Sequence, residues 1–131
     1  MNIEVYKAYR FAKKAHKGQV DKAGKKYISH PLRVSKRVKS MDAKIVALLH
    51  DVVEDTKYTL DDIEKKFGKN IAHSVKLLTH DENVSYEDYI DLILTDKTAT
   101  EVKMSDLLDN MNNFRMPNMK LNDHIIEKHK L

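Results

Sequence analysis

A run of five apolar residues, 45–49, leads directly into a cluster of ionisable side chains at residues 50–55, His-Asp-Val-Val-Glu-Asp. Ionisable groups rarely enter a protein core unless they are paired or bound to a metal. If the segment is one continuous helix, His50 and Glu54 lie one turn apart and Asp51 can lean toward the same point. We therefore predict that His50 and Asp51 bind one divalent cation, with Glu54 and Asp55 beside its water. A His-Asp dipeptide alone is common on surfaces, so further ligands must come from elsewhere.

The composition restricts both the fold and the kind of metal ligand. The 131 residues include no cysteine, so a metal must be held by His, Asp or Glu. The few glycines and prolines, three and two, favour a mostly helical chain. Its apolar stretches are far shorter than the roughly 20 residues that cross a bilayer. We expect one cytoplasmic domain, residues 1–131, with an all-α fold of seven or eight helices around one metal site.

Helix signals divide the chain. Asn2 can cap a first helix that ends near His16, and Ser29-His30-Pro31 opens a second helix. Asp42 is expected to cap the third helix, which carries the cluster at 50–55. Further helices are predicted at about 60–67, at 70–79, from residue 85, at 97–113 and at 119–131.

Two more candidate ligands lie on these helices. His30 stands at a helix start and is followed by Pro31, which suits a preorganised ligand, although a capping or surface role is the alternative. Asp106 is surrounded by apolar residues of the longest predicted helix, which implies partial burial; a solvated face would look similar. We expect the helices that carry His50 and Asp106 to face each other across the metal.

Charge is unevenly distributed along the chain. Residues 1–44 hold thirteen Lys and Arg against three Asp and Glu, and residues 45–131 hold eleven against seventeen, so charges of +10 and −6 sum to +4. Solvated helix faces would explain this pattern. Alternatively, the basic part attracts an anionic ligand toward the metal. Nucleic acid is considered an unlikely partner, because Tyr6, Tyr9 and Phe11 are interpreted as helix core.

Taken together, these motifs resemble the HD superfamily of metal-dependent phosphohydrolases from about residue 5 to residue 116. The resemblance is closer to the hydrolase domain of the RelA/SpoT family, and it rests on three segments: Tyr27-Ile28-x-His30-Pro31-Leu32, the run from Leu48 to Thr56, and Val102-Lys103-x-x-Asp106. Members of that branch remove the 3′-pyrophosphate of guanosine tetra- and pentaphosphate, usually with Mn²⁺. The resemblance thus implies hydrolysis of an anionic nucleotide.

The resemblance also implies a role for each matching residue. The implied metal ligands are His30, His50, Asp51 and Asp106; the pair that handles water is Glu54 and Asp55; the substrate contacts are Lys22, Lys103 and Asn110. Three positions depart from the family pattern. Asp21 replaces an arginine of the basic loop, and Leu107 and Asp109 replace a basic and an aromatic or histidine residue, which we interpret as lost substrate contacts.

Two alternatives remain open at this point. The departures favour a phosphohydrolase that acts on another nucleotide. A catalytically silent nucleotide-binding module is the other possibility, although such a module would not need Glu54 and Asp55. The sequence does not specify the oligomeric state.

Overall fold

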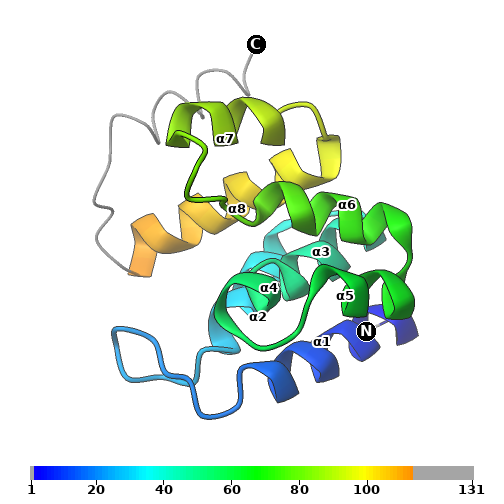
Figure 1. Ribbon diagram of the computed structural model, residues 1–131. Coiled ribbons are helices and arrows are strands. Elements are labelled where there is room, and N and C mark those ends of the chain that lie inside the picture. The colour runs from blue at the N-terminus through cyan, green and yellow to red at the C-terminus, as the bar shows by residue number, and fades with distance from the viewer. Residues whose placement is uncertain (1, 114–131) are drawn as a thin grey trace.

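The computed structural model describes residues 2–113, which form eight helices (Figure 1). They are α1 Ile3–Ala15, α2 Ser29–Arg37, α3 Met41–Leu49, α4 Val52–Asp55, α5 Leu60–Phe67, α6 Lys69–Leu78, α7 Tyr86–Ile93 and α8 Lys97–Asn113. Within this range the only β pairing is a single antiparallel bridge between Val20 and Lys26. The predicted all-α fold is confirmed, while the helix predicted at 119–131 lies outside the described residues. None of the described helices is long and apolar enough to cross a membrane.

Short polar side chains begin several of these helices. Asn2 caps α1 and Thr59 takes part in a capping box at α5, as their positions in the sequence predict. The prediction for α3 was wrong by two residues. Its cap is Ser40, whose hydroxyl accepts the Ala43 N–H at 3.1 Å, whereas Asp42 lies in the first turn.

Helix α3 is the centre of the molecule. Residues 45–49 are all buried, and α1, α2, α6 and α8 all pack against this helix (Figure 1). Burial on several sides requires apolar side chains around the whole helix, which the run at 45–49 supplies. The contact between α3 and α8 agrees with the prediction that the helices carrying His50 and Asp106 face each other.

The chain bends sharply after α3. The single helix predicted through residues 50–55 is in fact two, because α3 ends at Leu49, His50 and Asp51 form a turn, and α4 begins at Val52. The His50 ring provides a physical reason. Its Nδ1 lies 2.5 Å from the Ala47 carbonyl oxygen, which in a continuous helix would accept the Asp51 N–H.

Candidate metal centre

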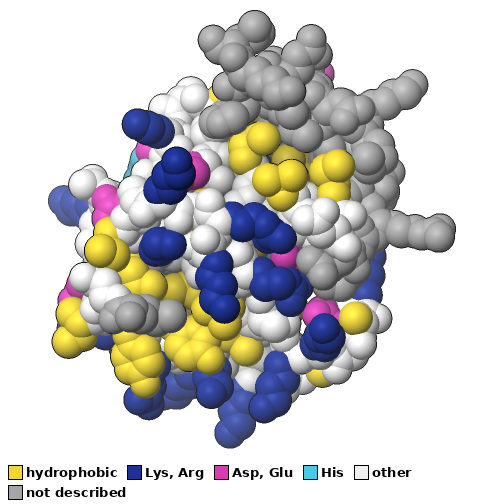
Figure 2. Space-filling view, turned by 180° about the vertical axis from the view of Figure 1, so that it is seen from behind, with side chains coloured by type: hydrophobic (Ala, Val, Ile, Leu, Met, Phe, Trp, Pro, Cys, Tyr) yellow, Lys and Arg dark blue, Asp and Glu magenta, His cyan; other side chains and the backbone are white. Residues whose placement is uncertain are grey.

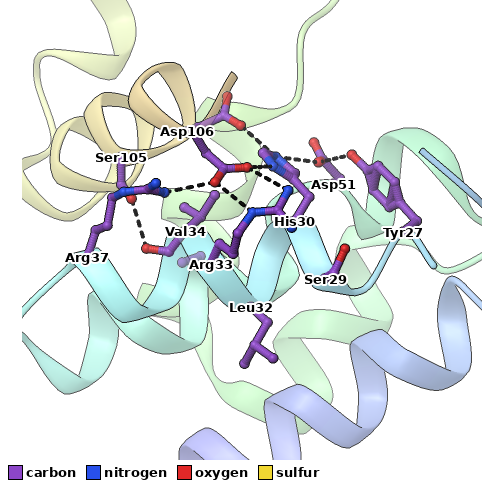
Figure 3. A network of polar contacts seen from close by, with 12 residues as sticks. Tyr27, Ser29, His30, Leu32, Arg33, Val34, Arg37, Asp51, Ser105 and Asp106 are labelled. Carbon is purple, nitrogen blue, oxygen red and sulfur yellow. Dashed lines mark hydrogen bonds and ion pairs between the residues drawn. The ribbon is translucent and has the colours of Figure 1, made fainter. Parts of the chain in front are cut away.

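Three buried side chains from separate parts of the chain converge beside the end of α3. His30 comes from the first turn of α2 and Asp106 lies in the middle of α8 (Figure 3). His50 follows α3. One ligand atom of each lies within 4.8 Å of those of the other two. Two ligands on opposite sides of a bound cation are about 4.2 Å apart, twice a typical metal–ligand distance. The three side chains could therefore hold one ion with a small adjustment.

The second ring nitrogen of His50 shows that this centre requires a positive charge. Because Nδ1 donates to the Ala47 carbonyl, Nε2 carries the free lone pair, and this buried atom has no hydrogen-bond partner among the described residues. It faces Asp51 Oδ2 at 3.1 Å and Asp106 Oδ1 at 3.4 Å. A lone pair and two carboxylate oxygens repel one another unless a cation lies between them.

The same groups determine the pKa values of the centre. Burial opposes protonation of His50, but the Asp51 and Asp106 carboxylates outweigh burial and hold the His50 pKa well above its usual range. Burial likewise opposes ionisation of Asp106, yet the neighbouring His30 and His50 rings and the Lys103 ammonium hold the Asp106 pKa well below normal. The site therefore attracts a proton, or a divalent cation in its place, which fits a metal centre.

Asp51 lies next to this cluster and is oriented by a tyrosine. Its Oδ2 is 3.9 Å from His30 Nε2, and it accepts a hydrogen bond from the Tyr27 hydroxyl (Figure 3). Burial, together with the charge of Asp51, raises the pKa of Tyr27, so the phenol keeps the proton that it donates. Tyr27 was part of the sequence motif, but its role could not be assigned before its hydroxyl was placed.

Comparison with known proteins agrees with this arrangement. The HD domain family matches residues 8–125. The chain belongs to the HD domain family. A solved structure described as a metazoan ortholog of SpoT that hydrolyses ppGpp superposes with a TM-score of 0.73 and 26% sequence identity, covering 86% of this chain and 71% of the other.

Curated relatives of this HD domain include much longer bacterial proteins. A guanosine-3′,5′-bis(diphosphate) 3′-pyrophosphohydrolase of Aquifex aeolicus is 38% identical over 82% of this chain and 17% of its own length. The bifunctional (p)ppGpp synthase/hydrolase SpoT of Escherichia coli is 38% identical over 62% of this chain and 12% of its own length. The chain thus spans less than a fifth of these relatives.

A third carboxylate in this HD domain supports the first histidine. Asp109 is fully buried, and its Oδ2 accepts a hydrogen bond from His30 Nδ1 at 2.6 Å. Its two oxygens also accept hydrogen bonds from Arg33, at 2.8 and 3.1 Å, and from Arg37, at 2.9 Å. Burial works against ionisation, but these partners hold the Asp109 pKa at about 2. The ionised carboxylate therefore keeps the proton on Nδ1 and leaves His30 Nε2 available to a metal.

Sequence reasoning did not find the structural role of this part of α8. Leu107 and Asp109 were interpreted as lost substrate contacts; in the structure Leu107 lies in the core and Asp109 binds His30. A signal was present in the spacing. Arg33 and Arg37 lie one turn apart on α2, and their paired cations predict a carboxylate on a neighbouring helix.

The two residues predicted to handle water lie on α4, at the edge of the centre. Glu54 accepts the backbone N–H of His80 at 2.6 Å, which connects α4 to the turn after α6. The carbonyl oxygen of Asp55 accepts the Gln19 side-chain amide at 2.9 Å. Partial desolvation, assisted by the charges of Asp51 and Glu54, raises the pKa of Asp55 to about 6. Both carboxylates are exposed, so solvent water can reach them.

The three predicted substrate contacts have different surroundings. Lys22 is exposed in the loop between α1 and α2, and Asn110 is half-buried on α8. The ammonium of Lys103 lies 3.5 Å from Asp106 Oδ2 and 5.4 Å from the centre of the Tyr89 ring. Lys103 therefore neutralises a candidate ligand, and its role toward a substrate stays a prediction.

Proposed function

We propose that this chain is a metal-dependent phosphohydrolase that removes the 3′-pyrophosphate of guanosine tetra- or pentaphosphate, releasing GDP or GTP and pyrophosphate. The convergence of His30, His50 and Asp106 around the unpartnered His50 Nε2 carries the proposal. Relatives whose names describe this activity support it. We also propose that the protein is cytoplasmic, which is compatible with a nucleotide substrate.

The proposed ligands are His30, His50, Asp51 and Asp106, and the proposed metal is Mn²⁺. Two imidazoles and two carboxylates suit a borderline divalent ion of this kind. When bound, such an ion lowers the pKa of a coordinated water and neutralises charge on the phosphate. Tyr27 and Asp109 keep Asp51 and His30 in the orientation and protonation state that binding requires.

Glu54 and Asp55 are proposed to orient the attacking water and accept its proton. Asp55 is suited to the second task, because a base works best when its pKa lies near the working pH, and partial desolvation brings that of Asp55 to about 6. Glu54 is anchored by the His80 amide and is proposed to position the water. Lys22, Lys103 and Asn110 are the proposed contacts to the nucleotide.

The loop between α1 and α2 favours a second candidate function, hydrolysis of a different nucleotide. Asp21 stands where the resemblance implies an arginine, and its Oδ1 accepts the backbone N–H groups of Ala23 and Lys25, both at 2.9 Å. The carboxylate thereby closes the loop on itself. Of the arginine and lysine that the resemblance implies at positions 21 and 22, only Lys22 remains, which weakens selection of a highly phosphorylated substrate.

Pyrophosphate release by the purified protein with Mn²⁺ tests the first function. We expect turnover of guanosine tetraphosphate that EDTA abolishes and that added Mn²⁺ restores. Asp106→Ala should abolish both metal binding and turnover. No pyrophosphate release at micromolar enzyme would refute the proposal.

A nucleotide panel under the same conditions separates the alternatives. Faster turnover of a nucleotide without a 3′-pyrophosphate would favour the second candidate. A ligand that binds and is recovered unchanged after prolonged incubation with Mn²⁺ would identify a silent binding module.

A further inference from the structure

A hollow that none of the candidate metal ligands lines lies between α1 and the loop that follows it. It is a groove of about 780 Å³. Five cationic side chains line it and no Asp or Glu does; the five are Arg10, Lys13, Lys14, Lys17 and Lys26. No salt bridge involves any of these five within residues 2–113. We call this surface the α1 groove.

Aromatic rings alternate with the cations in the α1 groove. Tyr6 is 46% exposed, so its interpretation as helix core was wrong, and its ring centre lies 6.4 Å from that of Tyr9. Arg10 lies 6.0 Å from the Tyr6 ring centre, and Lys13 lies 6.0 Å from that of Tyr9. We ranked nucleic acid low as a partner because we did not expect rings and cations to interleave in this way.

The cationic surface continues along α1 beyond the groove. A neighbouring hollow of about 490 Å³ shares Tyr6, Arg10 and Lys14 with the α1 groove. It is also lined by Lys7 and Lys66. Figure 2 shows Lys and Arg side chains along the lower edge of the molecule, beside a group of hydrophobic side chains, and α1 runs along the same edge in Figure 1. The thirteen residues of α1 extend over about 20 Å, at 1.5 Å each.

We propose that the α1 groove binds single-stranded nucleic acid, with the cations along the phosphate backbone and the Tyr6 ring under a base. Proteins that bind single strands combine a cationic groove with exposed aromatic rings on which bases stack. The continuation along α1 suits several linked nucleotides better than one. An acidic peptide would match the charge but would leave the exposed ring without a stacking partner.

Binding of a fluorescein-labelled ten-residue oligouridylate, followed by anisotropy with the full chain, tests this proposal. We expect binding that weakens with salt and persists in EDTA. Tyr6→Ala should weaken it roughly 5- to 100-fold and Tyr6→Phe should not, because stacking requires only the ring. The double change Lys13→Gln and Lys14→Gln should make the slope of log K against log salt shallower by about 1.4, or ~0.7 for each lost phosphate contact.

Matched controls use similar residues elsewhere. Lys69 and Lys76 are exposed on α6, so changing both to glutamine alters the net charge equally without touching the groove, and Leu92→Ala removes an exposed apolar side chain from α7. Both controls should bind like the unchanged protein. Circular dichroism should show that all variants stay folded.

Three results would overturn the proposal. Equal affinity for polyglutamate would reveal a purely electrostatic surface, and a free mononucleotide binding as tightly as the oligomer would identify a different ligand. Displacement of the oligomer by guanosine tetraphosphate in Mn²⁺ but not in EDTA would place its binding at the metal centre. Because the assay runs in EDTA, its outcome is independent of whether the proposed hydrolase activity exists.

Discussion

Replacing Asp109 by asparagine tests how His30 is prepared for a metal. Asp109 Oδ1 accepts hydrogen bonds from Arg33 and Arg37, and Oδ2 accepts them from His30 and Arg33. An amide keeps only one of these oxygens, so its NH₂ group must face one set of donors. The orientation in which the NH₂ group faces His30 costs less free energy, because the His30 ring can move its proton from Nδ1 to Nε2. The proton would then lie between Nε2 and Asp106 Oδ1, which are 2.8 Å apart, where the metal should bind.

The size of the effect follows from these bonds. The amide gives up two hydrogen bonds that have a charged partner, each worth about 1.5–3 kcal/mol, and regains a neutral one of about 1 kcal/mol. We therefore expect Asp109→Asn to lower the free energy of unfolding by about 2–5 kcal/mol. Loss of the carboxylate behind a metal-binding histidine typically weakens metal affinity by ~10–100-fold, which we expect for Mn²⁺.

Urea unfolding in EDTA measures the first quantity and calorimetric titration with Mn²⁺ the second. Glu82→Gln, an exposed carboxylate-to-amide change in the turn after α6, is the control. The ¹⁵N shifts of the His30 ring should report the change of tautomer in the metal-free variant. If Asp109→Asn matches the control in both stability and Mn²⁺ affinity, the positioning role of Asp109 is refuted.

The remaining predictions concern the other residues of the centre. Asp106→Ala should lose the metal, whereas Glu54→Gln should keep it and lose ~10²–10⁴ in kcat, as metal analysis and kinetics would show; equal metal loss would make Glu54 a ligand. Asp55 must be ionised to act as a base, so kcat should fall as pH drops through about 6, and Asp55→Asn should remove that dependence from the pH profile. Tyr27→Phe removes the donor to Asp51 and should weaken Mn²⁺ binding severalfold in calorimetry without unfolding the protein; unchanged affinity would contradict the orienting role of this hydroxyl.

Local patterns predicted the parts of the fold that depend on neighbouring residues. The cap at Asn2 and the capping box at Thr59 depend on groups within three residues, so sequence spacing is sufficient to locate them. The cluster of His30, His50 and Asp106 was predicted through the resemblance to the HD superfamily, because the residues alone left surface roles open for His30 and Asp106.

Features that depend on two separated segments could not be obtained in this way. The bond from His30 to Asp109 joins residues 79 positions apart, and only the packing of α2 against α8 brings them together. The exposure of Tyr6 has a similar origin. Val5 and Ala8 form the buried face of α1, and which tyrosines lie beside that face depends on how the neighbouring elements cover the helix.

The bend at His50 explains both where the predicted helix ends and how His50 and Asp51 come close together. Adjacent residues on a continuous helix point about 100° apart, so His50 and Asp51 could approach one ion there only by leaning toward each other. In the turn between α3 and α4, His50 Nε2 and Asp51 Oδ2 lie 3.1 Å apart. The ring that forms the bond to the Ala47 carbonyl oxygen thus interrupts the helix and presents its other nitrogen to the centre. The residue pair that suggested a metal site is therefore also the pair at which the predicted helix ends.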